Sequence, residues 1–297
     1  MESDAGHVPV LLAETLELLA VTPGGLWVDG TLGLGGHAEA VLRASSPDGR
    51  LVGLDRDGEA LEHARERLRP FGERARLEHA DYREIPERLG GEPASGILLD
   101  LGVSSLQLDD AERGFSLRRD GPLDMRMDRS ARGTAFELVN RLRESELADL
   151  LHELGEEPFS RRIARAIARA RERAPIQTTT ELAEIVRRAA PRSRRPGFHP
   201  ATRTFQALRI RVNRELDGLG DALERAAACL RPGGRMVVIA FHSLEDRAAK
   251  TSFRALASRG FALVNRKPLR PGADETRRNP RARSARLRAL VREEAAA

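Results

Sequence analysis

The chain has 297 residues, of which 40% are hydrophobic and 32% charged, and its formal net charge is +5. These proportions are typical of a soluble globular protein with a sizeable core, built as one large domain or two modest ones. The single cysteine, Cys229, excludes an internal disulfide and a cysteine-rich metal site. No apolar run is long enough to span a membrane, and Met1–Asp4 lacks the basic start of a signal peptide. We therefore expect a cytoplasmic protein with no membrane partner.

The basic side of the charge balance is almost entirely arginine, because the only lysines are Lys250 and Lys267. Arginine presents a planar fork to phosphates and stacks on bases, so this composition permits an RNA partner. It is equally consistent with GC-rich codon usage, and acidic residues nearly balance the arginines. Charge alone therefore leaves both explanations open.

The most informative stretch follows an amphipathic helix that we predict over residues 9–19, with proline in its first turn. A short apolar strand over 26–29 ends in Asp29 and enters a glycine-dense loop, after which residues 38–43 have helical spacing. This order is typical of a nucleotide-binding turn, because glycine takes positive φ and a helix start offers free N–H groups.

The glycine spacing in this loop favours one class of cofactor. Gly33 and Gly35 stand four and six residues after Asp29, and Gly36 adjoins them. The pattern is not G-x-G-x-x-G and is closer to the D-x-G-x-G-x-G loop of S-adenosylmethionine (SAM) methyltransferases, with Thr31 in place of the first glycine. A glycine-rich turn can also be purely structural, so the loop alone does not decide the function.

A second apolar strand over 50–55 ends in Asp55, 19 residues after Gly36. Doubly wound folds place at this distance the acid that binds the ribose hydroxyls of a nucleotide, so Asp55 is the predicted ribose ligand. The alternative is that Asp55 or Asp57 caps the next helix, over 58–68. The cap position suits Asp57 and leaves Asp55 free.

Two further strands bring polar side chains to the same edge of a parallel sheet. The third, over 76–82, ends in Asp81 and Tyr82. In a nucleoside site these two could accept from the adenine amino group and stack on the ring, although a tyrosine at a strand end is often only packing. The fourth, over 96–100, delivers Asp100 to the carboxyl edge, where open α/β sheets bind ligands.

The alternation of strands and helices stops from Leu106 to about Arg211, where we find only helical patterns. We expect a helical insertion that begins with a long irregular segment over 109–128, of the kind that is usually functional. The expected helices cover 134–142, 145–154 with a serine cap, 161–173 and 180–189.

Arginine density peaks inside this insertion. The two runs are Arg161, Arg162, Arg165, Arg169, Arg171 and Arg173, and then Arg187, Arg188, Arg192, Arg194 and Arg195. A basic helical insertion is typical of a nucleic-acid platform. The alternative is a solvated face whose arginines pair with Glu153, Glu156, Glu157 and Glu172.

Two helices, over 201–216 and 220–230, lead back to the sheet, and Cys229 falls in an apolar pattern that favours a core position over a nucleophile. A Pro-Gly-Gly turn then precedes an apolar strand over 235–241.

Later β patterns over 261–265 and 286–291 would complete the sheet as an antiparallel edge. The predicted fold class is therefore α/β: a doubly wound, Rossmann-like SAM-dependent methyltransferase sheet with an inserted all-helical domain. The methyltransferase domain would take residues 1–105 and 213–297, and the insertion, with a role in substrate recognition, residues 106–212.

Over nearly all its length, the chain resembles the family of ribosomal RNA small-subunit methyltransferase H. The members of this family are SAM-dependent enzymes that make N4-methylcytidine in 16S rRNA. The resemblance rests on motifs spread along the sequence. They are HVPVLL from His7, DGT from Asp29 with GGH from Gly35, LDLGVSS from Leu99 with QLD from Gln107, RGFS from Arg113, DGPLDMRM from Asp120, TFQALRI from Thr204, FHSLEDR from Phe241 and NPRARSA from Asn279.

The resemblance implies that SAM is the cofactor and indicates its contacts. They are Gly33, Gly35, Gly36 and His37 in the loop, Asp55 on the ribose, Tyr82 where the family often has phenylalanine, then Asp100 and Gln107. Gln107 comes from the resemblance alone, since it is otherwise one polar residue in a loop. The implied partner is 16S rRNA, methylated on a cytidine of the decoding (P-site) region within the assembled small (30S) ribosomal subunit.

The cytosine amine is a poor nucleophile because its lone pair is delocalised into the ring, so a site has to orient it and accept its N–H hydrogens. Many amino-methyltransferases use an Asp/Asn-Pro-Pro-aromatic turn here, but this sequence reads Asp100-Leu101-Gly102-Val103. Our hypothesis is that Asp100 bridges cofactor and amine while the turn over 241–243 helps to hold the flipped base. His242 is a second catalytic candidate, as a base, although a histidine after an apolar strand is at least as often structural.

The histidines are scattered without ligand spacing, so we expect no catalytic metal. Three other functions share parts of the pattern. The glycine spacing speaks against a nicotinamide-dependent oxidoreductase, and only turnover excludes a nucleic-acid-binding protein that keeps SAM as a sensor. The missing diproline turn disfavours a DNA amino-methyltransferase, although DNA stays open as a second target.

Overall fold

The computed structural model describes residues 9–190 and 199–294. The chain divides into two compact units. The first, called here the sheet unit, runs to Gly102 and resumes at Gly218, whereas the second, the helical unit, is Val103–Asp217. The sheet unit is therefore assembled from two segments that the helical unit separates in sequence.

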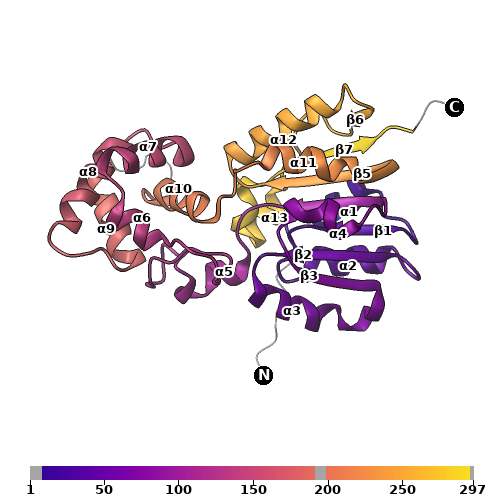
Figure 1. The fold of residues 1–297 in the computed structure, drawn as a ribbon, viewed down its shortest axis with the longest axis horizontal. Helices are drawn as coiled ribbons and strands as arrows, with labels where there is room; N and C mark the ends of the chain where they lie inside the picture. Colours follow the sequence, from indigo (N-terminus) through magenta and orange to yellow (C-terminus); the bar gives the residue numbers. More distant parts are fainter. Residues whose placement is uncertain (1–8, 191–198, 295–297) are drawn as a thin grey trace. The chain divides into compact units, whose positions relative to one another are not determined.

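The described part of the sheet unit contains a seven-stranded sheet of order β3-β2-β1-β4-β5-β7-β6. The strands are β1 (Leu26–Asp29), β2 (Arg50–Asp55), β3 (Ala75–His79), β4 (Ala94–Asp100), β5 (Leu230–Ala240), β6 (Phe261–Leu263) and β7 (Arg286–Arg292). Strands β1 to β5 pair in parallel, and β7 is antiparallel to both β5 and β6. Figure 1 shows β5 and β7, in orange and yellow, on the same sheet as the indigo N-terminal strands. The predicted α/β fold class and its antiparallel edge are confirmed.

The strand order reverses at the pairing of β1 with β4, which aligns Asp29 with Leu98. Doubly wound sheets bind their ligands outside the carboxyl ends of the strands at such a reversal. Asp29 ends β1 and Asp100 ends β4, so both acids lie at this point of the sheet.

Helices cover both faces of this sheet. One group is α1 (Leu12–Leu19), α2 (Gly36–Ala44) and α3 (Gly58–Leu68), and the other is α4 (Ile85–Leu89), α11 (Leu219–Ala228) and α12 (Ser243–Leu256). Alternate residues of neighbouring strands, including Trp27, Leu51, Leu98 and Val237, pack with the first group in one core. The short helix α13 (Ala273–Arg278) precedes β7 in the chain. Among the described residues, no helix is both long enough and apolar enough to cross a membrane.

The helical unit forms its own core from apolar side chains between Phe115 and Leu208. Its helices are α5 (Ser105–Asp109), α6 (Ala135–Arg141), α7 (Glu144–Gly155), α8 (Ser160–Arg171), α9 (Thr179–Ala189) and α10 (Thr202–Asn213). Between α5 and α6 the chain is largely irregular, as predicted, and buried polar side chains order it. The guanidinium of Arg113 donates to the carbonyl of Met127 (2.7 Å), and the side chain of Asn213 accepts from the N–H of Met127 (2.7 Å) and donates to the carbonyl of Met125 (2.7 Å).

Several predicted element ends are wrong, and three of them have a clear local cause. Helix α1 begins at Leu12 rather than residue 9, because Leu11 takes a left-handed conformation with φ +53°. Helix α7 has Arg143 as its N-cap instead of the predicted serine, and the carboxylate of Glu146 satisfies the Arg143 N–H (2.9 Å). Strand β3 ends at His79, since the chain turns into a short 3-10 helix at Tyr82.

The Pro-Gly-Gly turn lies inside β5 rather than before it. Leu230 pairs with Ala94 and Arg235 with Gly96, so the four residues 231–234 of β5 stand opposite the single residue Ser95 of β4. Gly233 has φ +75°, which permits this bulge. The strand thus begins at Leu230, before the turn, and still delivers Phe241 and His242 to the carboxyl edge.

Candidate active site

The loop between β1 and α2 has the backbone of an anion-binding turn. Gly33 and Gly35 have φ values of +52° and +78°, which disfavour other residues. Gly35 is the N-cap of α2, so no side chain of the described residues caps the first N–H groups of this helix. A Cβ on Gly36 would lie 2.6 Å from Cγ of Pro9, which explains a third glycine. The free end of α2 can therefore receive a negatively charged ligand group.

Thr31 joins the ends of β1 and β4. Its N–H donates to Oδ1 of Asp29 (3.1 Å), and its hydroxyl oxygen accepts from the backbone N–H of Asp100 (2.6 Å). A glycine, which the methyltransferase loop pattern has here, could make only the first bond. Nothing in the sequence pattern assigns this role, and its only signal is a hydroxyl side chain two residues after the acid.

His37 and Asp100 face each other with unused hydrogen-bonding atoms. Nε2 of His37 lies 3.6 Å from Oδ2 of Asp100. Both ring nitrogens of His37 and Oδ1 of Asp100 are buried and have no hydrogen-bond partner among the described residues. Buried polar atoms normally have partners, so these three atoms point to a ligand.

Asp29 lies behind this pair with only 3% of its surface exposed. Burial raises the pKa of its carboxyl to about 7, and the nearby Asp100 and Asp55 act in the same direction. His37 and the Thr31 N–H lower that pKa but do not cancel the effect of burial. A carboxyl group near half-protonation at neutral pH is thus built into the end of β1.

Asp55, the predicted ribose ligand, supports the glycine loop. Its Oδ2 accepts from the N–H of Gly33 (2.7 Å) and its Oδ1 from the N–H of Asp57 (2.8 Å). Burial raises the pKa of Asp55 above its ordinary value although both N–H bonds lower it. Asp57 caps α3 by accepting from the N–H of Glu59 (3.1 Å), as predicted. The ribose role of Asp55 stays a prediction.

Asp81 and Tyr82 follow β3 at the same edge. Both carboxylate oxygens of Asp81 accept from the guanidinium of Arg83 (2.9 Å each), and Arg56 also pairs with it. These arginines help to hold the pKa of Asp81 below its usual value against the effect of burial. The guanidinium of Arg83 also lies 4.8 Å from the centre of the Tyr82 ring. Asp81 is therefore engaged by arginine side chains, and the adenine roles of both residues stay predictions.

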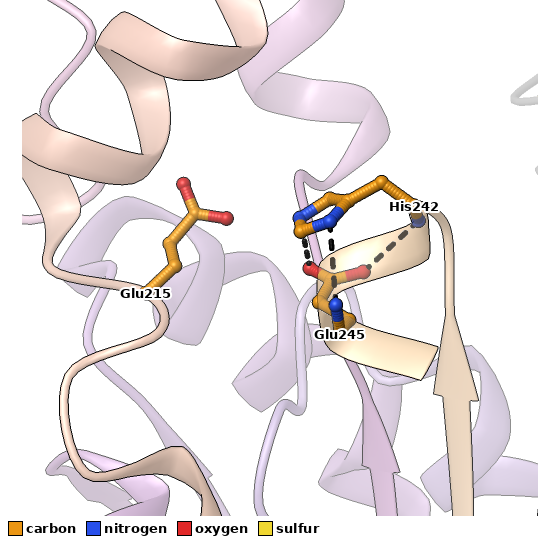
Figure 2. A group of neighbouring side chains, drawn as sticks. All are labelled: Glu215, His242 and Glu245. Atoms are coloured by element: carbon orange, nitrogen blue, oxygen red, sulfur yellow. Dashed lines mark hydrogen bonds and ion pairs between the residues drawn. The ribbon is translucent and has the colours of Figure 1, made fainter. Parts of the chain in front are cut away.

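His242 is the N-cap of α12 and faces Glu245 (Figure 2). Its Nδ1 accepts from the N–H of Glu245 (3.4 Å), and its Nε2 lies 3.0 Å from Oε1 of the same residue. The other oxygen of Glu245, Oε2, accepts from the N–H groups of Phe241 (2.8 Å) and His242 (3.3 Å). This reciprocal capping box uses the Nδ1 lone pair that a base would need, so the geometry favours the structural role of His242.

Gln107 lies in α5 of the helical unit and takes part in a second capping box. Its N–H donates to Oγ of Ser104 (3.3 Å), and its side-chain oxygen accepts from the N–H of Ser104 (3.0 Å). Its residue type is thus explained by the start of α5, and its predicted cofactor contact stays a prediction.

The predicted arginine runs separate into different environments. Arg187 and Arg188 in α9 both pair with Glu184, with N–O distances of 2.6 Å. The guanidinium of Arg171 donates to the carbonyl of Val139 (2.6 Å) and to that of Leu142. Arg192, Arg194 and Arg195 lie outside the described residues. Within the described residues, the arginines at positions 161–173 form no ion pair with the acids suggested as their partners from the sequence, which were Glu153, Glu156, Glu157 and Glu172. Arg165 pairs instead with Glu144 (3.5 Å).

Cys229 follows α11, where it is half-buried and its Sγ lies 3.4 Å from the carbonyl oxygen of Arg225. Burial raises the pKa of its thiol, which disfavours the thiolate that a nucleophile needs.

The expectation that the chemistry uses no metal stays a prediction.

The chain is similar to known methylases over nearly its whole length. A family model described as the MraW methylase family matches residues 4–293. The ribosomal RNA small subunit methyltransferase H of Symbiobacterium thermophilum is 51% identical over 96% of this chain and 96% of its own length, and that of Syntrophotalea carbinolica is 52% identical over 96% and 98%. The solved structure of an rRNA methylase from Streptococcus thermophilus is 13% identical, covers 97% of this chain and 100% of its own, and gives a TM-score of 0.46.

Proposed function

The chain belongs to the MraW methylase family, and from this membership we propose that it transfers a methyl group from SAM to the N4 amine of a cytidine in the decoding (P-site) region of 16S rRNA. The acceptor is the assembled small (30S) ribosomal subunit rather than naked RNA. In this proposal the helical segment 106–212 recognises the substrate, and the sheet unit binds the cofactor.

The residues of the sheet unit fit SAM. The uncapped start of α2, with Gly33, Gly35, Gly36 and His37, suits its carboxylate and ammonium end. Asp55 would take the ribose, Tyr82 the adenine, and Asp100 and Gln107 complete the set. The fit rests on the buried ring nitrogens of His37, which have no hydrogen-bond partner among the described residues.

Bound SAM supplies an electrophilic methyl group on a sulfonium centre. The task of the protein is to present the cytosine amine to it in line and to accept an N–H hydrogen, so that the nitrogen lone pair becomes available. Asp100 is the group for this task. Its backbone is fixed by Thr31, and its Oδ1 is an acceptor without a partner in the described chain. The proton that leaves the amine would pass to this carboxylate or to water.

The turn at Phe241 and His242 would help to hold the flipped base beside Asp100. The capping box with Glu245 makes this turn rigid, and a rigid wall suits a positioning role. His242 then acts by fixing the turn, and its role as a base is the weaker of its two hypotheses.

The observation that carries the proposal is Oδ1 of Asp100, which lies at the reversal point of a doubly wound sheet and has no hydrogen-bond partner in the described parts of the chain. The test is transfer of labelled methyl from SAM to purified 30S subunits that lack the modification, with free 16S rRNA and DNA as parallel acceptors. Nucleoside mass spectrometry should find N4-methylcytidine in the subunits. Label in DNA would identify a DNA amino-methyltransferase, and tight SAM binding without any transfer would identify a SAM sensor instead.

A further inference from the structure

The start of helix α8 in the helical unit breaks two rules of helix stability. Its N-cap is Phe159, whose side chain makes no capping hydrogen bond, where Ser, Thr, Asp or Asn would satisfy a free N–H. Its first turn holds Arg161 and Arg162 and no acid, which puts positive charge at the positive end of the helix dipole. The buried carboxylate of Glu157 accepts from the backbone N–H of Phe159 (3.0 Å), but this bond accounts neither for the aromatic N-cap nor for the arginines of the first turn. We therefore look for the reason for these residue types in an external partner.

The outward side of α8 joins an aromatic ring to a row of arginines. Ile163, Ala164 and Ile167 point into the core of the unit. Five of the exposed side chains on and beside the helix, Phe159, Arg161, Arg162, Arg165 and Arg169, are called here the α8 face. The C-cap residue Glu172 is also exposed, at the other end of the helix. The side chain of Phe159 is one of two large apolar groups left exposed in the described chain, at 42%.

The positive charge of the α8 face is not neutralised within the described residues. Arg161, Arg162 and Arg169 make no side-chain hydrogen bond or ion pair there. Arg165 lies 3.5 Å from Glu144 with both side chains well exposed, a geometry that contributes little stability. In α9 of the same unit, by contrast, Arg187 and Arg188 share the carboxylate of Glu184. The α8 face is therefore free to bind an anion.

We propose that the α8 face binds a single-stranded part of the RNA substrate, with the arginines on phosphates and Phe159 stacked on an unpaired base. The proposal rests on the proposed function, because it takes RNA as the polyanion. Guanidinium groups match phosphate oxygens, and an exposed aromatic ring beside them matches the face of an unstacked base. A bare polyphosphate would use the arginines alone and leave the position of the ring unexplained. An anionic membrane would need more apolar area than the single exposed ring of Phe159 offers on this face.

The arginine part is tested by the salt dependence of binding to 30S subunits that lack the modification, with magnesium held constant. Each phosphate contact adds about 0.7 to 0.9 to the slope of log affinity against log salt concentration. The triple variant Arg161→Gln, Arg162→Gln, Arg169→Gln should lower this slope by about 2 to 3. The same three positions changed to Lys should keep it. The matched control Arg187→Gln, Arg188→Gln removes arginines that are already paired and should change it much less.

The aromatic part has a different signature. Phe159→Ala should weaken binding about tenfold at one salt concentration and leave the slope unchanged, because stacking releases no counterions. Phe159→Tyr keeps a ring and should bind like the wild type. Both substitutions keep the backbone bond from the Ile163 N–H to the Phe159 carbonyl, so the helix start is preserved.

An unchanged salt slope in a folded triple Gln variant would overturn the proposal, and so would equal slopes for the Gln and Lys series. Methyl transfer by the wild-type chain separates this failure from that of the proposed function. Normal transfer with an unchanged slope rejects the α8 face alone. No transfer together with the predicted loss of slope rejects the methyltransferase function and supports the RNA contact.

Discussion

The hydroxyl oxygen of Thr31 accepts a 2.6 Å hydrogen bond from the backbone N–H of Asp100. The two residues are 69 positions apart in the sequence and meet because β1 and β4 are neighbours at the reversal of strand order. Thr31 also donates its own N–H to Asp29. Thr31, through its hydroxyl and its backbone N–H, therefore sets the position of the acid that we assign to the target amine relative to the loop that we assign to the cofactor.

Replacing Thr31 by valine keeps the shape of the side chain but removes the acceptor for the Asp100 N–H. Leaving a largely buried donor unpaired should lower the free energy of unfolding by about 1–3 kcal/mol. We also expect weaker SAM binding, because the end of β4 is no longer held against the loop. Thr31→Ser keeps the hydroxyl and is the matched control. Denaturant unfolding and calorimetric SAM titration measure both effects, and identical behaviour of the two variants would refute the role of the hydroxyl.

The carboxyl of Asp29 should make stability depend on pH. Its pKa is about 7 in the folded chain against an ordinary value of 3.8, so between these values the folded state binds more protons than the unfolded state. Stability should therefore fall as pH rises from about 4 to 7, by up to about 4 kcal/mol, and level off above that window. Asp29→Asn cannot ionise and should become progressively more stable than the wild type over this range. Parallel unfolding curves for the two proteins at pH 5 and pH 8 would contradict the assignment.

The ends of the parallel strands could be predicted from the sequence because their signal is local. An apolar run closed by an acid marks Asp29, Asp55 and Asp100, and a parallel sheet brings such ends to one edge. The cap at Asp57 was predictable for the same reason, since it depends only on the start of the next helix.

Contacts between distant residues, and caps made by unusual residue types, could not be predicted in this way. The bond between Thr31 and Asp100 depends on strand order, which a pattern read along the chain does not contain. The cap of α7 at Arg143 works through the side chain of Glu146, and the sequence favoured the nearby serine. The positive φ of Leu11 shortens α1 in a way that helix propensity does not show.

Asp100→Asn tests the assignment of the amine acceptor. The substitution keeps the backbone N–H bonded to Thr31 and the size of the side chain, but it removes the negative charge that would attract the amine hydrogen. We expect SAM affinity within a few-fold of the wild type and methyl transfer slower by about 10²–10⁴ in single-turnover assays. Asp57→Asn is the control, because Asn also caps a helix and Asp57 lies in the same unit. Full turnover in Asp100→Asn with unchanged SAM affinity would mean that Asp100 serves the cofactor only.

His242 is tested by two substitutions that separate capping from catalysis. Asn is a good N-cap, so His242→Asn should keep α12 in place and retain most methyl transfer. His242→Ala removes the side-chain cap and the group 3.0 Å from the buried carboxylate of Glu245, so it should lower the free energy of unfolding by about 1 kcal/mol or more. The rate of methyl transfer as a function of pH separates the two roles, because a capping role does not affect it. If His242 is a base, the rate falls at acidic pH in the wild type, and this fall disappears in His242→Asn. A His242→Asn variant as stable as the wild type but slower by about 10²-fold or more, with that fall gone, would establish His242 as the base and reject the structural role that its contacts favour.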